Sequence, residues 1–146
     1  MIGPKRPKLT KRQERDAYFD ATERDSVNGI ERCQRCGVYG SCDRDHRQNR
    51  DRYNTTVGNL QLLGSDFGCG CHRWKTEHPA KALDEGYAVP RNANPLDYPA
   101  YRYGVGWVLY YDEPGERGEW WEVISETRAR ELMYGWAPDA LNGTWF

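Results

Sequence analysis

The sequence predicts an α+β protein whose small core is reinforced by bound metal, and three observations lead to this expectation. The chain has 146 residues with a hydrophobic fraction of 38%, which leaves room for one domain with a modest core. Short segments of strand-like and helix-like pattern follow one another along it. Cys33 and Cys36 have the spacing of a zinc knuckle, and a second close pair, Cys69 and Cys71, can share the same ion. A core of this size gains stability from such a metal.

An N-terminal helix is expected first, within a basic segment that covers residues 1–31. The stretch KLTKRQERDAYFDATERDS can form this helix, with Thr10 as its N-cap. The tripeptide VNG at 27–29 should break it.

The cysteines follow directly. The motif CQRCG places Cys33 and Cys36 two residues apart, so that both sulfurs of a tight turn can face one tetrahedral ion, and Gly37 relieves the backbone behind them. The five cysteines cannot all pair as disulfides, and the basic start of the chain lacks an apolar signal region, so a reducing cytoplasm and a metal site are favoured. We expect Cys69 and Cys71 to complete a structural Zn²⁺ site, with Cys42 as a competing ligand.

Two strands and two helices are expected next. YGSCDRDHR reads as a strand, NRDRYNTTVG as a polar loop and NLQLLG as a second strand. CHRWKTEH then predicts a short helix, and PAKALDEGYAVP a second one that begins at Pro79 and ends near Gly86. His78 stays open between a helix cap, a phosphate contact and a metal ligand.

The segment 100–146 is aromatic and acidic. It predicts a β-hairpin around the turn DEPGERGE, followed by a helix with Ser125 as N-cap. Its aromatic side chains could stack on bases, but the acidic surroundings favour packing against the rest of the protein or a partner. The side chains in question are Trp107, Tyr110, Trp120 and Trp121.

Charge is divided along the chain. Residues 1–91 carry 17 Lys and Arg against 13 Asp and Glu, whereas residues 92–146 carry 4 against 9. A basic front half suits a phosphate backbone, although a solvated surface would explain it too. The expected phosphate contacts are Arg44, Arg47, Arg50 and Arg52, together with Lys5, Arg6, Lys8, Lys11 and Arg12 of the N-terminal arm.

Taken in order, these motifs resemble the HNH endonucleases, particularly small ones encoded by phages of actinobacteria. The match covers residues 32–99 and rests on CQRCG, DRDHR, NLQLL and CHRWKTEHPAKALDEGYAVPR, with His46, Asn59 and His72 spaced thirteen residues apart. The resemblance implies a ββα-metal (His-Me finger) core. In related sequences the third zinc cysteine often follows the second strand directly, where this chain has Gly64.

Phosphodiester hydrolysis needs an activated water and a cation, and this set of residues can supply both. Asp45 and His72 are expected to hold a divalent ion, Mg²⁺ or Mn²⁺, with positions left for water and phosphate. His46 is expected to be the general base. Asn59 could orient His46 through its side-chain oxygen or, as the resemblance implies, through its backbone carbonyl.

The function expected is therefore a metal-dependent endonuclease that nicks or cuts DNA in a host cytoplasm, with a phage packaging terminase as a possible partner. No apolar run is long enough to cross a membrane, so no membrane partner is expected. Two alternatives stay open. One is a zinc-stabilised DNA-binding or packaging module without cleavage, and the other is an interaction protein that docks through its Trp-rich tail.

Overall fold

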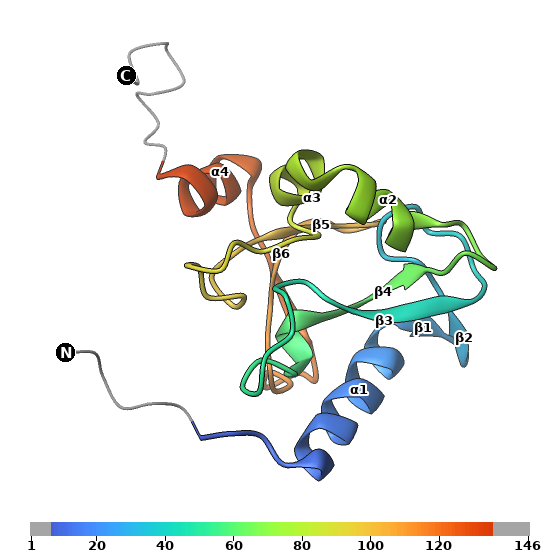
Figure 1. Ribbon diagram of the computed structural model, residues 1–146. Coiled ribbons are helices and arrows are strands. Elements are labelled where there is room, and N and C mark those ends of the chain that lie inside the picture. Colours follow the sequence, from blue (N-terminus) through green and yellow to red (C-terminus); the bar gives the residue numbers. More distant parts are fainter. Residues whose placement is uncertain (1–6, 136–146) are drawn as a thin grey trace.

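Short helices and short antiparallel strands alternate along residues 7–135, which are the residues that the computed structural model describes (Figure 1). In chain order the elements are α1 (Lys11–Asp25), β1 (Ser26–Val27), β2 (Ile30–Glu31), β3 (Cys42–His46), a 3₁₀ turn (Val57–Asn59), β4 (Leu60–Gly64), α2 (Cys71–Glu77), α3 (Pro79–Glu85), β5 (Ala100–Arg102), β6 (Gly106–Tyr110), β7 (Trp121–Val123) and α4 (Glu126–Tyr134). This mixture confirms the predicted α+β class. Within the described range, no helix combines the length and the apolar character that crossing a bilayer requires.

Helix α1 begins where its capping residues predict. The Gln13 amide donates to the Thr10 hydroxyl at 3.1 Å, and the Thr10 amide donates to the Gln13 side chain at 2.9 Å, which forms a reciprocal capping box. Ala17 and Ala21 face inward and pack against Leu60 of β4. The helix is thus fixed both at its start and along one side.

The predicted break after α1 is a tight hairpin. Asn28 and Gly29 have positive φ angles of 52° and 79°, and β1 pairs with β2 across them. Two such residues in succession are typical of the hairpin turn that suits the twist of paired strands. The hairpin leads the chain from α1 into the cysteine knuckle.

Strands β3 and β4 pair antiparallel, from Cys42 opposite Gly64 to His46 opposite Leu60. Leu60, Leu62 and Leu63 of β4 are fully buried, and α1 and α2 lie on opposite sides of the strand pair (Figure 1). Helices α2 and α3 follow β4 with the bounds that the sequence predicts, and α3 ends at Gly86 in a left-handed conformation. This strand–strand–helix order brings the end of β3 close to the first turn of α2.

The C-terminal segment holds one strand more than predicted. The expected hairpin is β6 paired with β7, but β5 adds to its other side and makes a three-stranded sheet. Helix α4 is capped by Ser125 as expected, through the Arg128 amide at 3.1 Å. Trp107 and Tyr110 are buried, so packing, the favoured alternative for these aromatic side chains, is what the structure shows.

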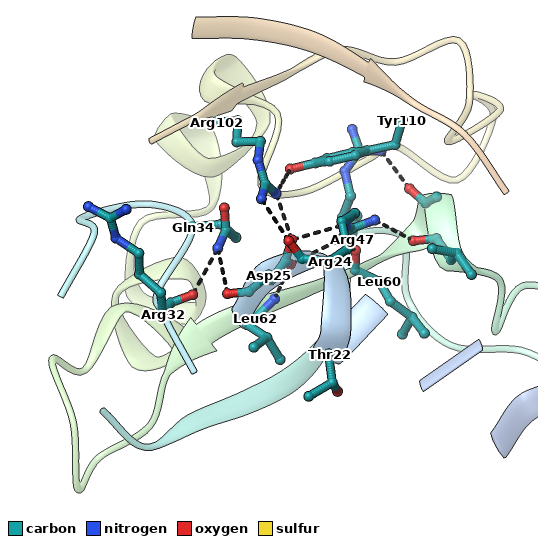
Figure 2. Close-up of polar contacts among 12 residues, drawn as sticks. Thr22, Arg24, Asp25, Arg32, Gln34, Arg47, Leu60, Leu62, Arg102 and Tyr110 are labelled. Atoms are coloured by element: carbon teal, nitrogen blue, oxygen red, sulfur yellow. Dashed lines mark hydrogen bonds and ion pairs between the residues drawn. The ribbon is translucent and has the colours of Figure 1, made fainter. Parts of the chain in front are cut away.

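A buried ion cluster joins this sheet to α1 (Figure 2). Asp25, at the end of α1, accepts hydrogen bonds from Arg24 at 2.8 and 2.9 Å and from Arg102 of β5 at 2.6 Å. The same carboxylate accepts from the Leu62 amide of β4 at 3.1 Å. The Tyr110 ring lies 4.3 Å from the Arg24 guanidinium. Polar contacts therefore hold three elements together at the centre of the protein.

Candidate functional site

Four cysteines converge on one point beside α2. The Sγ atoms of Cys33, Cys36, Cys69 and Cys71 all lie within 4.8 Å of one another. Four thiolates around one Zn²⁺ at about 2.3 Å would lie about 3.8 Å apart, so a small contraction would close the site around the ion. The group could hold a structural metal such as zinc, which is the ligand set that the sequence predicts.

Cys42, the competing ligand, does not belong to this group. Its thiol donates to the Gly40 carbonyl at 3.4 Å, and burial raises its pKa to about 12. Cys69 is the fourth member of the cysteine group instead, and Gly64 leaves room for its sulfur. A side chain at position 64 would collide with the Cys69 sulfur, so the missing Cβ provides the space that this sulfur occupies.

One cation lies directly against the cysteine group. The Arg35 guanidinium is 3.5 Å from the Cys71 sulfur and 3.5 Å from the centre of the Trp74 ring. His78 also stacks on the Trp74 ring, with 5.3 Å between the ring centres. Arg35 therefore places a positive charge where four thiolates and one Zn²⁺ would leave a net negative charge. His78, which stayed open at first, has no place in the cysteine group.

A second group forms where β3 ends and α2 begins. Nε2 of His72 lies 3.2 Å from Oδ1 of Asp45. The other oxygen of Asp45 accepts hydrogen bonds from Lys75 at 2.6 Å and from Gln61 at 2.8 Å. Burial raises the pKa of Asp45, but the contacts with His72 and Lys75 outweigh it, so the carboxylate stays ionised.

The separation of Asp45 and His72 suits a shared ion. Two ligand atoms at about 2.1 Å from an octahedral cation, at right angles to each other, are about 3.0 Å apart. A carboxylate oxygen is a donor that both Mn²⁺ and Mg²⁺ prefer, whereas an imidazole nitrogen suits a transition metal, so of these two ions Mn²⁺ fits the pair better. As the ring stands, its hydrogen bond to Asp45 raises the pKa of His72 to about 9, so a metal would have to displace a proton there.

His46 lies at the end of β3, next to Asp45. Its Nε2 is 2.9 Å from the Thr55 hydroxyl. The Tyr18 and His46 rings meet edge to face, with 5.9 Å between their centres. Burial lowers the pKa of His46, and the charges of Arg50 and Lys75 act in the same direction. The ring is therefore neutral at neutral pH, as a general base must be.

Asn59 has a different role from the one expected. Its side-chain oxygen accepts from the Gln48 amide at 2.8 Å, and its side-chain nitrogen donates to the Asn54 carbonyl at 2.9 Å. Its own carbonyl accepts from the Arg47 amide at 2.7 Å. Asn59 is fully buried and holds the two ends of the loop between β3 and β4 together, whereas the hydrogen bond to the His46 ring involves Thr55.

These side chains open onto one hollow of about 370 Å³. Its lining includes Asp45, His46, His72, Lys75 and Arg50. The structure thus brings together the three residues predicted for metal binding and proton transfer. Asn59 is buried and does not line this hollow. The loop 47–56, which leads from β3 to the 3₁₀ turn, carries Thr55 and also Arg50, which lines this hollow.

One expected phosphate contact is wrong. Arg47 is 1% exposed, and its guanidinium donates to four main-chain carbonyls, which are those of Gly58, Gly86, Pro95 and Tyr98. Figure 2 shows it beside Tyr110 in the interior. Alternating arginines on a polar stretch indicate a surface, but the fold turns this one inward, where it holds segments that lie far apart in the sequence.

The other arginines remain near the surface. Arg44 pairs with Glu31 at 2.8 Å, and Arg50 lies 3.7 Å from Glu14 with 60% of its side chain exposed. Arg52 is exposed and lies in a larger hollow of about 600 Å³. Lys8, Lys11, Arg50 and Arg52 line this hollow, against Glu14 and Asp51. Two residues of the expected arm, Lys5 and Arg6, lie outside the described residues.

Sequence reasoning missed several members of the site. Lys75 stands three residues after His72, and this spacing on one helix could have indicated it. Asp43 stands two residues before Asp45 on one strand, and its carboxylate is 2.7 Å from Nδ1 of His72. Thr55 gave no signal in the sequence. Comparison of the chain with protein-family models, with curated proteins and with solved structures finds no match.

Proposed function

We propose that this protein is a divalent-metal-dependent endonuclease of the HNH type, which hydrolyses phosphodiester bonds in DNA. One observation carries the proposal: Asp45, His46 and His72, from two elements, converge on one hollow, with Asp45 ionised and His46 neutral as such a reaction needs. The resemblance of the ordered motifs to that family supports it. The cysteine group beside α2 would stabilise the helix that carries His72.

Asp45 and His72 would hold the catalytic ion, Mg²⁺ or Mn²⁺. When bound, such an ion supplies a Lewis acid that polarises the phosphate and stabilises the oxygen that leaves. Two protein ligands leave several positions for water and for phosphate oxygens. Gln61 and Lys75 hold the second oxygen of Asp45, which keeps the first one directed at His72.

His46 would take a proton from the attacking water as the new P–O bond forms and the bond to the leaving oxygen breaks. The contact with the Thr55 hydroxyl occupies Nε2, which leaves Nδ1 as the ring nitrogen for this step. If Nε2 carries the hydrogen and donates it to Thr55, the lone pair on Nδ1 is free for the water. A base positioned in this way accelerates hydrolysis by about 10²–10⁴-fold.

The larger hollow, which is lined by Lys8, Lys11, Arg50 and Arg52 and is called the basic hollow below, would bind the DNA backbone. It shares Arg50 with the metal-binding hollow, so a strand that lies across the site can continue along the same positive surface. Within residues 7–135, Lys8, Lys11 and Arg52 have no ion-pair partner, which leaves their charges available to phosphates. Binding of this kind weakens steeply as salt is added.

A plasmid-nicking assay tests the function directly. Zinc-loaded protein should convert supercoiled plasmid to nicked or linear DNA in the presence of Mg²⁺ or Mn²⁺, and EDTA should stop the reaction. The variant His46→Ala should keep its zinc, its melting temperature and its affinity for DNA, and lose cleavage. A folded His46→Ala protein with full activity would refute the mechanism.

A second function has one observation in its favour. The Lys75 ammonium already neutralises Asp45, as expected of a protein that has kept the fold and lost its catalytic metal. Such a protein would be a zinc-stabilised DNA-binding module. Wild-type protein that binds DNA, binds no Mn²⁺ at this site and cleaves under none of the tested ions would favour this alternative.

A further inference from the structure

The imidazole of His72 is held between two carboxylates of the same strand. Its Nε2 lies 3.2 Å from Asp45, and its Nδ1 lies 2.7 Å from Oδ2 of Asp43. Because side chains two apart on a strand point to one face, β3 presents both carboxylates to the first turn of α2. Asp43 makes the shorter of the two contacts.

The two carboxylates lie on different sides of the ring. Asp45 lines the hollow that also contains His46 and Lys75. Asp43 instead lines a smaller hollow of about 120 Å³ behind His72, together with Asp66 and Arg73. Asp43 is therefore placed to act on the ring from behind, and not as a further ligand.

We propose that Asp43 is a positioning residue, which accepts the Nδ1–H hydrogen of His72 and so directs the Nε2 lone pair at the ion shared with Asp45. This inference rests on the proposed metal-binding role of Asp45 and His72. An imidazole binds a metal through one nitrogen only while the other carries the hydrogen, and a carboxylate on that second nitrogen fixes both the tautomer and the rotation of the ring.

The position of His72 makes this support necessary. The residue stands in the first turn of a seven-residue helix, and 40% of its side chain is exposed. In the part of the chain that the structure describes, the two carboxylates are the hydrogen-bond partners of its ring. With Asp43 removed, the ring could rotate about its side-chain bonds, and only a fraction of its orientations would offer Nε2 to the ion.

Asp66 provides a matched control. Its carboxylate lines the same small hollow, but it bonds to Arg73 at 2.7 and 3.0 Å and not to His72. Loss of its negative charge therefore reports the general electrostatic effect of a carboxylate near the site. Removal of the whole Asp43 carboxylate, as in Asp43→Ala, reports that effect together with the orientation of the ring.

The test measures Mn²⁺ affinity by calorimetry and by electron paramagnetic resonance on the full-length, zinc-loaded protein. Substitutions of groups that orient a metal ligand typically cost about 10–100-fold in metal affinity, and we expect a loss of this size for Asp43→Ala. Asp43→Asn keeps an acceptor oxygen and should lose much less, while Asp66→Asn should bind Mn²⁺ as wild type does. Zinc content and melting temperature should be unchanged in all three, and high Mn²⁺ should restore the cleavage rate of Asp43→Ala.

Three results would contradict the inference. Asp43→Ala with wild-type Mn²⁺ affinity, while His72→Ala loses binding, would overturn the role of Asp43 alone. Equal losses of Mn²⁺ affinity in Asp43→Ala and Asp66→Asn would show that the negative charge near the site matters and that the orientation of the His72 ring does not. An affinity that does not depend on His72 at all would overturn the proposed metal site, and this inference with it.

Discussion

Arg102 donates to Asp25 across 2.6 Å, although 77 residues separate the two along the chain. The carboxylate has no exposed surface, and only 8% of the Arg102 side chain is exposed. Figure 2 shows the pair with Arg24 and Tyr110 around it, between α1 and β5. The centre of the protein is thus held together by ionic contacts, which are stable only while both partners stay charged.

Acid should therefore weaken this protein through Asp25. Burial raises the pKa of Asp25, but the charges of Arg24 and Arg102 and their hydrogen bonds outweigh it and hold the pKa below its usual value. A lowered pKa in the folded state adds stability that is complete above the unfolded value of about 3.9 and is lost as the pH falls toward the folded value. Asp25→Asn should be about 3–5 kcal/mol less stable at pH 7, because it leaves two buried guanidinium groups without a counter-charge.

Urea unfolding of wild type and Asp25→Asn between pH 7 and pH 3 measures this effect. Below about pH 4 the difference in unfolding free energy should narrow by up to about 1.4 kcal/mol per pH unit. If the cysteine group holds zinc, its loss in acid would affect both proteins and cancel in the difference. Asp16→Asn, on the exposed side of α1, serves as the control. A constant difference over the whole range would show that Asp25 titrates alike in both states.

Local signals in the sequence gave the element bounds. Thr10, Pro79, Gly86 and Ser125 start or stop helices through contacts within four residues, so the pattern alone is sufficient. Strand β5 was missed because its three residues have no alternating pattern and owe their conformation to pairing with β6. The contact of Arg102 with Asp25 was missed for a related reason, since nothing local links positions so far apart.

The candidate site divides in the same way. The positions of Cys33 in the cysteine group and of Asp45 beside His72 could be predicted, because the spacing and the order of the motifs can be read directly from the sequence. Arg47 was wrongly placed on the surface because its partners are carbonyl groups, which every residue possesses and no pattern reveals. Thr55 was missed because a loop hydroxyl acquires a role only when the fold carries it to His46.

The cysteine group predicts a sharp difference between two substitutions. Cys36→Ser should release zinc and lower the melting temperature, because the binding free energy of a structural zinc is also folding free energy. Cys42→Ser should keep the metal, since this thiol points to the Gly40 carbonyl. Elemental analysis of protein purified without chelator, with thermal unfolding alongside, measures both. Zinc retained in Cys36→Ser and lost in Cys42→Ser would show that Cys42 is a zinc ligand and that Cys36 is not.

Removal of the Lys75 charge should have opposite effects on metal and on substrate. Its ammonium lies 2.6 Å from Asp45 and opposes any divalent ion that binds there. Two unit charges about 4 Å apart interact by about 1 kcal/mol even in bulk water, and Mn²⁺ carries two charges, so Lys75→Met should bind Mn²⁺ more than tenfold more tightly. The same change removes a positive charge from the hollow that is proposed to bind the scissile phosphate, so KM for DNA should rise.

Lys75→Arg keeps the charge and is the matched control for this comparison. Lys81→Met, on the exposed surface of α3, controls for loss of a lysine elsewhere. Calorimetric titration with Mn²⁺ and steady-state cleavage kinetics give the two quantities. Weaker Mn²⁺ binding in Lys75→Met would show that the lysine supports the metal site through Asp45 and does not compete for it.

Two arginines five residues apart, Arg47 and Arg52, should behave as opposites. Arg52 is exposed, has no ion-pair partner within residues 7–135 and lines the basic hollow. Arg52→Ala should leave the melting temperature unchanged. It should also flatten the slope of log K against log salt by about 0.9 on duplex DNA, which is the value of one lost phosphate contact.

Arg47 should affect stability and leave the salt dependence alone. Its guanidinium satisfies carbonyls of Gly58, Gly86, Pro95 and Tyr98, and each unsatisfied buried group costs about 1–3 kcal/mol. Arg47→Met should therefore lower the melting temperature strongly, and Arg47→Lys should do so as well, because one ammonium cannot replace a fork that reaches four carbonyls. DNA titrations at several salt concentrations, at a temperature where each variant is folded, complete the comparison. An Arg47 variant with wild-type stability and a flatter salt slope would put this guanidinium on DNA, and the buried network in the interior would then have to be rearranged when DNA binds.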